Sequence, residues 1–165
     1  MATEDKCIPE TMIKAADRIA KTIIENWTSE EKALLMNMLE VSGIPGNKLL
    51  NIKEMSESIC VPRYIPCYNV SDFLKYLKNE REVHHIMAYM KNAGLVDIVE
   101  NKDLKTTMYG IMPLGILISS RLTLHERENG YPVMKYILDR TIDGAKKDEE
   151  FEAVEKLVAL REMYD

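Results

Sequence analysis

The sequence predicts a single, mainly α-helical domain with a small β-hairpin: a winged-helix core with flanking N- and C-terminal helices. Three observations predict it. A chain of 165 residues can bury one core, and 46% apolar with 30% charged residues is a globular composition. Helical periodicity runs along most of the chain but gives way to strand-like residues over 95–111. We expect one unit, 1–165, with helices in 1–42, the winged-helix core in 43–120 and helices in 121–165.

Two helices are predicted at the N-terminus. Apolar residues recur at steps of three and four over 9–26; this stripe comprises Met12, Ala16, Ile19, Ile23 and Trp27. Thr28 or Ser29 can cap a second helix, which ends before Pro45. Its expected buried side comprises Leu34, Leu35, Met38, Leu39 and Val41.

The middle of the chain predicts a short helix over 51–59, a loop over 60–70 and a helical turn over 71–77. A stronger helix follows over 80–92, where Gly94 suits the position after its end. The expected inward face of that helix comprises Val83, Ile86, Met87 and Met90.

Strand-like residues follow over 95–99 and 106–111, with a turn at 101–103 between them. Three helices followed by a hairpin is the order of a winged helix. Pro113 suits the first turn of another short helix, and further helices are expected over 132–141 and 148–164. The last should bury Phe151, Val154, Val158 and Leu160.

Charge and cysteine usage restrict the functional class. The net charge of −5 gives no broad electrostatic attraction to nucleic acid or anionic lipid. Residues 1–20 lack the apolar segment of a secretory signal, and the apolar stretch 109–118 is too short to span a membrane. Cys7, Cys60 and Cys67 form no CxxC pair, so we expect a soluble, cytoplasmic protein with reduced thiols.

No catalytic, cofactor-binding or metal-ligating set is predicted. His84 and His85 are adjacent, so on a helix they point about 100° apart and cannot share one ion. His125 lies in a polar turn, and Cys60 and Cys67 have no further ligands nearby. The glycines are too widely spaced for a nucleotide-binding loop. An enzyme that uses these histidines or cysteines is the weakest hypothesis.

DNA binding is the main alternative to the function given below. The helix over 80–92 would be the recognition helix, and 101–105 the wing. The exposed side of that helix offers four basic or titratable residues, Arg81, His84, His85 and Lys91, but also Glu80 and Glu82. Without a basic stripe the phosphate contribution is missing. The alternative is therefore a winged-helix regulatory protein that binds a partner or, weakly, DNA.

Two segments carry a resemblance to a known family, HHIMAYMKNAGLVDIV at 84–99 and MYGIMPLGILIS at 108–119. They resemble the N-terminal dimerisation domain of plant S-adenosylmethionine-dependent O-methyltransferases, which act in plant secondary metabolism on phenolics, isoflavonoids and alkaloids. LEVSGIP at 39–45 and PVMKYILDRTIDGAKK at 132–147 agree with it. The positions that match the family pattern around the wing are Ile86, Met87, Met90, Leu95, Val96, Tyr109 and Leu114.

The resemblance implies a domain that holds two chains together through its early helices. Eleven methionines mildly favour an interface as well. The expected interface residues are Met12, Ile19, Ile23, Trp27, Leu34, Leu35 and Met38. The partner would be a second copy or a full-length O-methyltransferase, with a small phenolic or alkaloid ligand at the interface.

The family's S-adenosylmethionine-binding domain and its catalytic histidine have no counterpart in these 165 residues. The resemblance therefore implies pairing rather than methyl transfer, no cofactor in this chain, and either a fragment or a stand-alone partner. The expected loop at 60–70 is also longer than is typical of the family.

Overall fold

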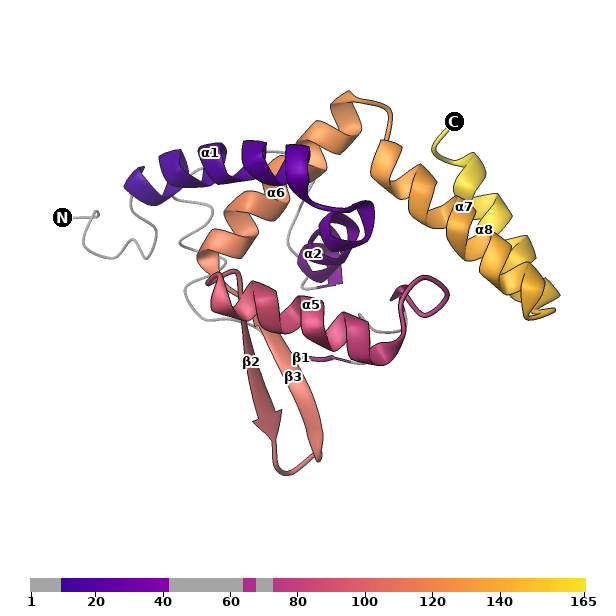
Figure 1. Ribbon diagram of the computed structural model, residues 1–165, viewed down its shortest axis with the longest axis horizontal. Coiled ribbons are helices and arrows are strands. Elements are labelled where there is room, and N and C mark those ends of the chain that lie inside the picture. The colour runs from indigo at the N-terminus through magenta and orange to yellow at the C-terminus, as the bar shows by residue number, and fades with distance from the viewer. Residues whose placement is uncertain (1–9, 42–63, 68–72) are drawn as a thin grey trace.

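The computed structural model describes residues 10–41, 64–67 and 73–165, which form a mainly α-helical fold with a small antiparallel sheet, as predicted (Figure 1). The helices are α1 (Glu10–Asn26), α2 (Ser29–Val41), α5 (Glu80–Asn92), α6 (Pro113–Glu128), α7 (Pro132–Lys147) and α8 (Phe151–Glu162). The strands are β1 (Ile65–Pro66), β2 (Val96–Asn101) and β3 (Thr106–Ile111).

The start of α2 is fixed by a reciprocal pair of hydrogen bonds. The Thr28 hydroxyl accepts from the Glu31 amide at 3.2 Å, and the Glu31 carboxylate accepts from the Thr28 amide at 3.0 Å. This capping box satisfies two backbone donors that a helix start leaves unpaired. The inward face of α2 is confirmed, with Leu34, Leu35, Met38 and Leu39 fully buried. The side chain of Val41 and the helix expected over 51–59 lie outside the described residues.

The sheet corrects the prediction of a loop throughout 60–70. Ile65 and Pro66 form β1, which pairs antiparallel with β3, and β3 pairs in turn with β2. Beyond the strand, the Cys67 amide donates to the carbonyl of Thr107 at 2.9 Å. A proline is tolerated here because β1 lies at the sheet edge, where its missing N–H breaks no inner ladder. Together with α5, a three-stranded sheet in the order β1-β3-β2 is the arrangement of a winged helix.

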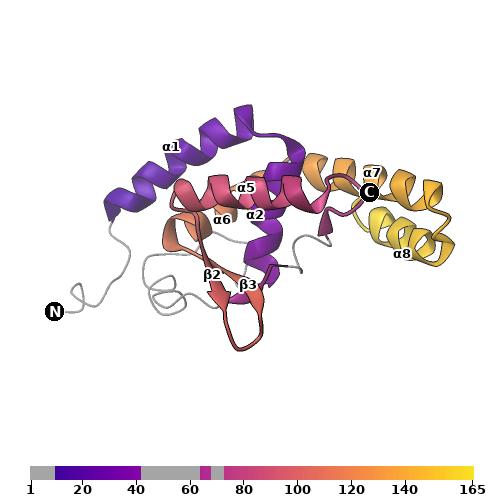
Figure 2. The ribbon, with the colours of Figure 1, turned by 60° about the horizontal axis from the view of Figure 1, so that its bottom comes forward.

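The helix and hairpin of this core follow the sequence prediction closely. Gly94, at φ +78°, ends α5; its amide donates to Lys91 and the amide of Leu95 donates to Met90, both at 3.0 Å. That pair of bonds is a Schellman motif. The hairpin pairs Val96 with Ile111 and Asn101 with Thr106. Figure 2 shows β2 and β3 side by side, with the turn that joins them at the bottom of the view.

The helix expected to be short after Pro113 is instead the 16-residue α6, against which both α1 and α2 pack. Apolar residues of α6 lie on several of its sides because neighbouring helices pack around it. The sequence therefore shows no single apolar stripe from which the length of the helix could be predicted. Its buried positions include Ser119, whose hydroxyl donates to the carbonyl of Leu35 at 3.1 Å. Residue 120, the expected end of the winged-helix core, lies inside α6.

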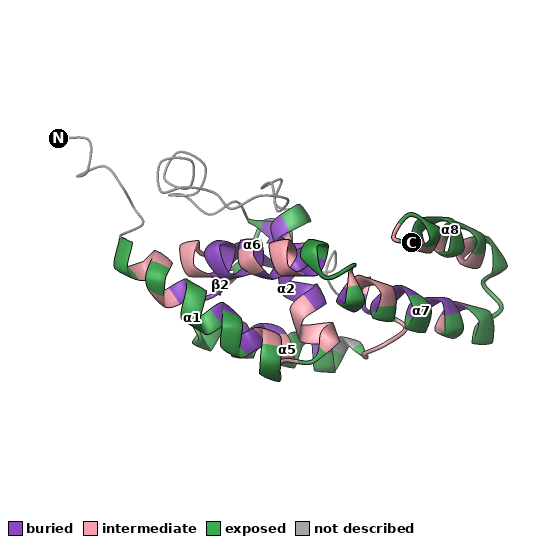
Figure 3. Ribbon diagram, turned by 90° about the horizontal axis from the view of Figure 1, so that it is seen from above, coloured by how far each residue is buried: buried purple, intermediate pink, exposed green. Residues whose placement is uncertain are grey.

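The last two helices form a pair that extends away from α1 and α6 (Figure 3). The helix predicted over 132–141 continues to Lys147, and α8 packs along it. The predicted inward face of α8 is wrong: Phe151 is 66% exposed, Val158 and Leu160 are also exposed, and Val154 is only half-buried. Among the described residues, α8 has α7 beside it but no second layer, and none of its residues is fully buried.

Candidate interaction site

A groove of about 310 Å³ runs between α1 and α5 and ends at the start of α6. Its walls are uncharged: the lining residues are Ile19, Thr22, Ile23, Trp27, Tyr89, Ala93, Leu95 and Leu114. An apolar hollow with few polar groups is the usual form of a binding site on a protein surface. In Figure 2, α1 and α5 can be followed along this side of the molecule.

The wall that α1 contributes follows from its sequence spacing. Positions at steps of three and four lie on one flank of a helix. The groove residues Ile19 and Thr22 belong to such a row, which has no charged member and comprises Met12, Ala15, Ile19, Thr22 and Asn26. The next arc of the helix buries Ala16, Ala20 and Ile23 in the core. An ion pair between Asp17 and Arg121 of α6 also ties α1 to α6. Ile19 remains 38% exposed, although it belongs to the predicted apolar stripe.

An aromatic contact joins the end of α1 to α5, the opposite wall of the groove. The rings of Trp27 and Tyr89 meet edge to face, with centroids 5.8 Å apart and planes at 60°. Trp27 follows the last turn of α1, where its amide donates to the carbonyl of Ile23 at 2.9 Å. Tyr89 is 51% exposed. An exposed aromatic ring held by another is typical of the anchors found at protein interfaces.

The structure separates the predicted interface residues into two groups. Ile23, Leu34, Leu35 and Met38 are buried in the core of the chain itself. Of these four, Ile23 also lines the groove, whereas the other three offer no surface to a partner in this conformation. The other three, Met12, Ile19 and Trp27, are exposed or half-buried, and two of them, Ile19 and Trp27, line the groove.

Sequence reasoning missed Tyr89, Ala93, Leu95 and Leu114 as groove residues. The sequence carries one usable signal for this wall, because Tyr89 lies outside the buried stripe of α5 formed by Val83, Met87 and Met90.

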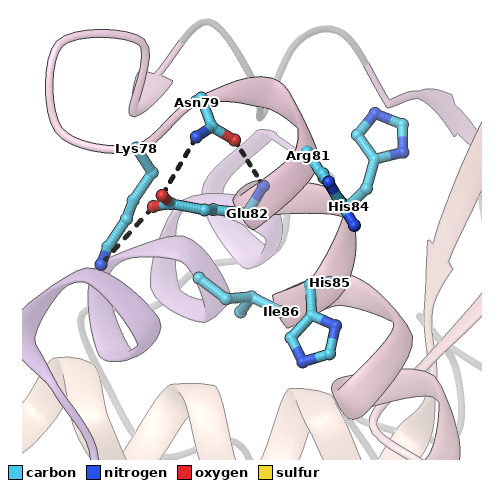
Figure 4. Close-up of a pocket in the computed structure, with 7 residues that line it drawn as sticks. All are labelled: Lys78, Asn79, Arg81, Glu82, His84, His85 and Ile86. Carbon is cyan, nitrogen blue, oxygen red and sulfur yellow. Dashed lines mark hydrogen bonds and ion pairs between the residues drawn. The ribbon is translucent and has the colours of Figure 1, made fainter.

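A second, more open hollow of about 720 Å³ surrounds the start of α5 (Figure 4). Asn79 caps the helix by accepting from the Glu82 amide at 2.9 Å, and its side-chain amide donates to the Glu82 carboxylate at 3.0 Å. Lys78 lies 3.8 Å from the same carboxylate. The carboxylate of Glu82 therefore already pairs with Lys78 within this hollow.

The candidate titratable groups do not converge. His84 and His85 point in different directions from α5, as their adjacency predicts (Figure 4). The prediction that His125 lies in a polar turn is wrong, because α6 continues to Glu128 and His125 lies in its last turn. Among the described residues, no three His, Cys, Asp or Glu side chains are grouped so that they could hold a metal ion.

Cys67 is buried, and desolvation raises the pKa of its thiol to about 11. Its thiol is thus protonated at neutral pH and a poor nucleophile. Cys7 and Cys60 lie outside the described residues.

No known protein family, curated protein or solved structure matches this chain. Over the part of the chain that the structure describes, no helix combines the length and apolarity needed to cross a membrane.

Proposed function

We propose that this chain is a dimerisation domain of the plant O-methyltransferase type, which pairs with a second copy or with a full-length methyltransferase in the cytoplasm. The observation that carries the proposal is the uncharged groove between α1 and α5, where Ile19 and Tyr89 stay exposed. The resemblance of 84–99 and 108–119 supports the same function and names the family.

Charged residues make up 30% of the chain and are available to cover its surface. Exposed apolar side chains that lie together in one place therefore need an explanation. A contiguous apolar patch on a protein surface commonly marks an interaction site. A second copy presents the same patch, so a two-fold interface would cover both at once. The early helices assigned to the interface by the resemblance include α1, which supplies one wall of the groove.

Substitution of Ile19 tests the proposal. Ile19→Glu places a charge in the centre of the groove, and we expect the dimer dissociation constant to rise about a hundredfold or more. Lys21→Glu is the matched control because it lies on the charged face of α1. Analytical ultracentrifugation of both variants measures the difference. Equal affinity in the two variants would remove the groove from the interface.

The ligand expectation can be tested at the same groove. A small phenolic or alkaloid ring could pack against Trp27 and Tyr89, whose edge-to-face contact leaves Tyr89 accessible. Calorimetric titration with a simple phenol series would detect such binding. A Tyr89→Ala variant should lose it, and no S-adenosylmethionine site is proposed in this chain.

The rival function is a winged-helix regulator that binds DNA through α5 and the β2–β3 hairpin. The accessible side of α5 presents Arg81 and two histidines to solvent, but Glu82 lies among them. Binding through phosphates must weaken steeply as salt rises. A gel-shift titration between 50 and 200 mM salt, roughly the range in which phosphate contacts are lost, separates the two functions: strong, salt-dependent retardation would favour the rival.

A further inference from the structure

We infer that the second copy lies antiparallel along α1, with the two-fold axis beside Thr22. The inference rests on the proposed function, which supplies the second copy, and it adds the orientation and register of the pair. The uncharged row of α1 that comprises Met12, Ala15, Ile19, Thr22 and Asn26 is called the seam below. With the axis at Thr22, residues 18–26 of the two α1 helices face each other, so Ile19, Thr22 and Asn26 are the seam residues in contact. Ile19 and Thr22 also line the groove, and Thr22 is small enough for the two helix backbones to approach closely at the axis.

The charges beside the seam decide the orientation. Arg18 and Glu25, both exposed, lie two turns apart along its solvent side. In a two-fold antiparallel pair of helices, each flank faces the same flank of the other copy. In a parallel pair, this charged row would instead cover the apolar groove floor of the other copy, where the charges would lose water without gaining a partner. The antiparallel orientation avoids that cost.

Arg18 and Glu25 also decide the register of the pair, that is, which seam residue lies at the two-fold axis. An axis at Ile19 brings the two copies of Arg18 within about 3 Å of each other along the helix, and an axis at Asn26 does the same for Glu25. Both arrangements oppose like charges. An axis at Thr22 places Arg18 within about 1.5 Å, along the helix, of Glu25 of the second copy. Symmetry repeats this ion pair on the other side of the axis, so two complementary contacts lie along the solvent side of the seam.

Charge reversal tests the register. Arg18→Glu or Glu25→Arg alone turns both ion pairs into like-charge contacts, and we expect the dissociation constant to rise about tenfold at low salt. The double variant should return to within about twofold of the unsubstituted chain, since it restores both pairs with the signs exchanged. Lys21→Glu is the control and should change the dissociation constant less than threefold, an estimate for a charge on the far side of the helix from the seam.

Mixing the two single variants gives the sharpest result. A chain with Arg18→Glu and a chain with Glu25→Arg should form heterodimers in preference to either homodimer, because only the mixed pair matches opposite charges at both contacts. Native mass spectrometry of the mixture counts the three species. A statistical mixture, with one half heterodimer, would overturn the register.

A cysteine at the axis provides an independent test. With Cys7 and Cys60 replaced by serine, Thr22→Cys should form a disulfide with its own copy under mild oxidation, and Lys21→Cys should not. Crosslinking of both at equal rates would contradict the axis. If none of the charge reversals changes the dissociation constant of the dimer, this register is overturned and the proposed function stands. If the unsubstituted chain is monomeric, the proposed function itself is overturned.

Discussion

The buried carboxylate of Glu126, near the end of α6, accepts a hydrogen bond from the amide of Val133 in α7 at 2.9 Å. Its second oxygen accepts from the amide of Met134 at 2.8 Å. The residue at the N-cap of α7, Tyr131, has φ +60° and makes no capping bond with its side chain. Glu126 therefore takes over the capping role and places a negative charge at the positive end of the helix dipole. This contact ties the start of α7 to the end of α6.

Replacement of Glu126 should destabilise the fold. Glu126→Ala leaves two helix amides without their acceptor in a buried place, and we expect a loss of about 3 kcal/mol in the free energy of unfolding. Glu126→Gln keeps one acceptor oxygen and should lose about 1 kcal/mol. Urea unfolding followed by circular dichroism measures both. Glu128→Ala, at an exposed position of the same helix, is the control; equal losses in Glu126→Ala and Glu128→Ala would refute the capping role.

Two glycines are needed for different reasons, and alanine substitution should separate them. A Cβ at Gly115 would overlap the backbone carbonyl oxygen of Leu95, which cannot move aside without shifting the sheet. Gly115→Ala should therefore cost about 3 kcal/mol. Gly94 has open space around it but φ +78°, so Gly94→Ala should cost only about 1 kcal/mol. Thermal unfolding of the two variants decides it; a larger loss at Gly94 would contradict the close approach of α6 to Leu95.

Much of the winged-helix core could be predicted because its signals are local. Gly94 marks the end of α5 by its left-handed backbone, and the side chain of Asn101 accepts from the amides of Asp103 and Leu104 to shape the hairpin turn. Thr28 and Glu31 similarly mark the start of α2. Each signal lies within a few residues of the feature it specifies.

The features that escaped prediction depend on contacts between distant segments. β1 is two residues long and exists as a strand because β3 pairs with it. The groove joins Ile19 and Trp27 to Tyr89, which is far along the chain, so no window of sequence contains it. The exposure of Phe151 follows from the absence of a second layer over α8 among the described residues, which a helical pattern cannot reveal.

Alkaline pH should weaken the fold through Cys67. Burial raises the pKa of its thiol from 9.0 to about 11, so the folded chain holds its proton where the unfolded chain releases it. The stabilising effect is complete below pH 9 and disappears as pH rises towards 11. A difference of about two pKa units corresponds to about 3 kcal/mol.

Urea unfolding at pH 8 and pH 10.5 measures this effect. Cys67→Ala should be less stable at pH 8 but should lose less stability on going to pH 10.5. Parallel losses in the two proteins would exclude the thiol as the source. The buried phenol of Tyr109, whose pKa burial raises to about 12, should leave a residual dependence above pH 10 in both.

Trp27 is the single tryptophan of the chain and lies in the groove, so its emission should report on pairing. A second copy over the groove excludes water from the indole, and dilution that separates the copies should shift the emission to longer wavelength. Ile19→Glu should show the long-wavelength emission at every concentration. Emission that stays constant from high micromolar to nanomolar concentration, in both proteins, would argue against coverage of Trp27 in the pair.

The most direct test of the proposed function is the absolute mass of the unsubstituted chain in solution, measured by light scattering after gel filtration. The chain has a mass of 19.0 kDa, and pairing through the groove between α1 and α5 predicts a particle of twice that mass at tens of micromolar, an estimate based on ordinary dimer affinities. Ile19→Glu should return it to 19.0 kDa. A strictly monomeric unsubstituted chain at that concentration would contradict the proposal that this domain holds two chains together.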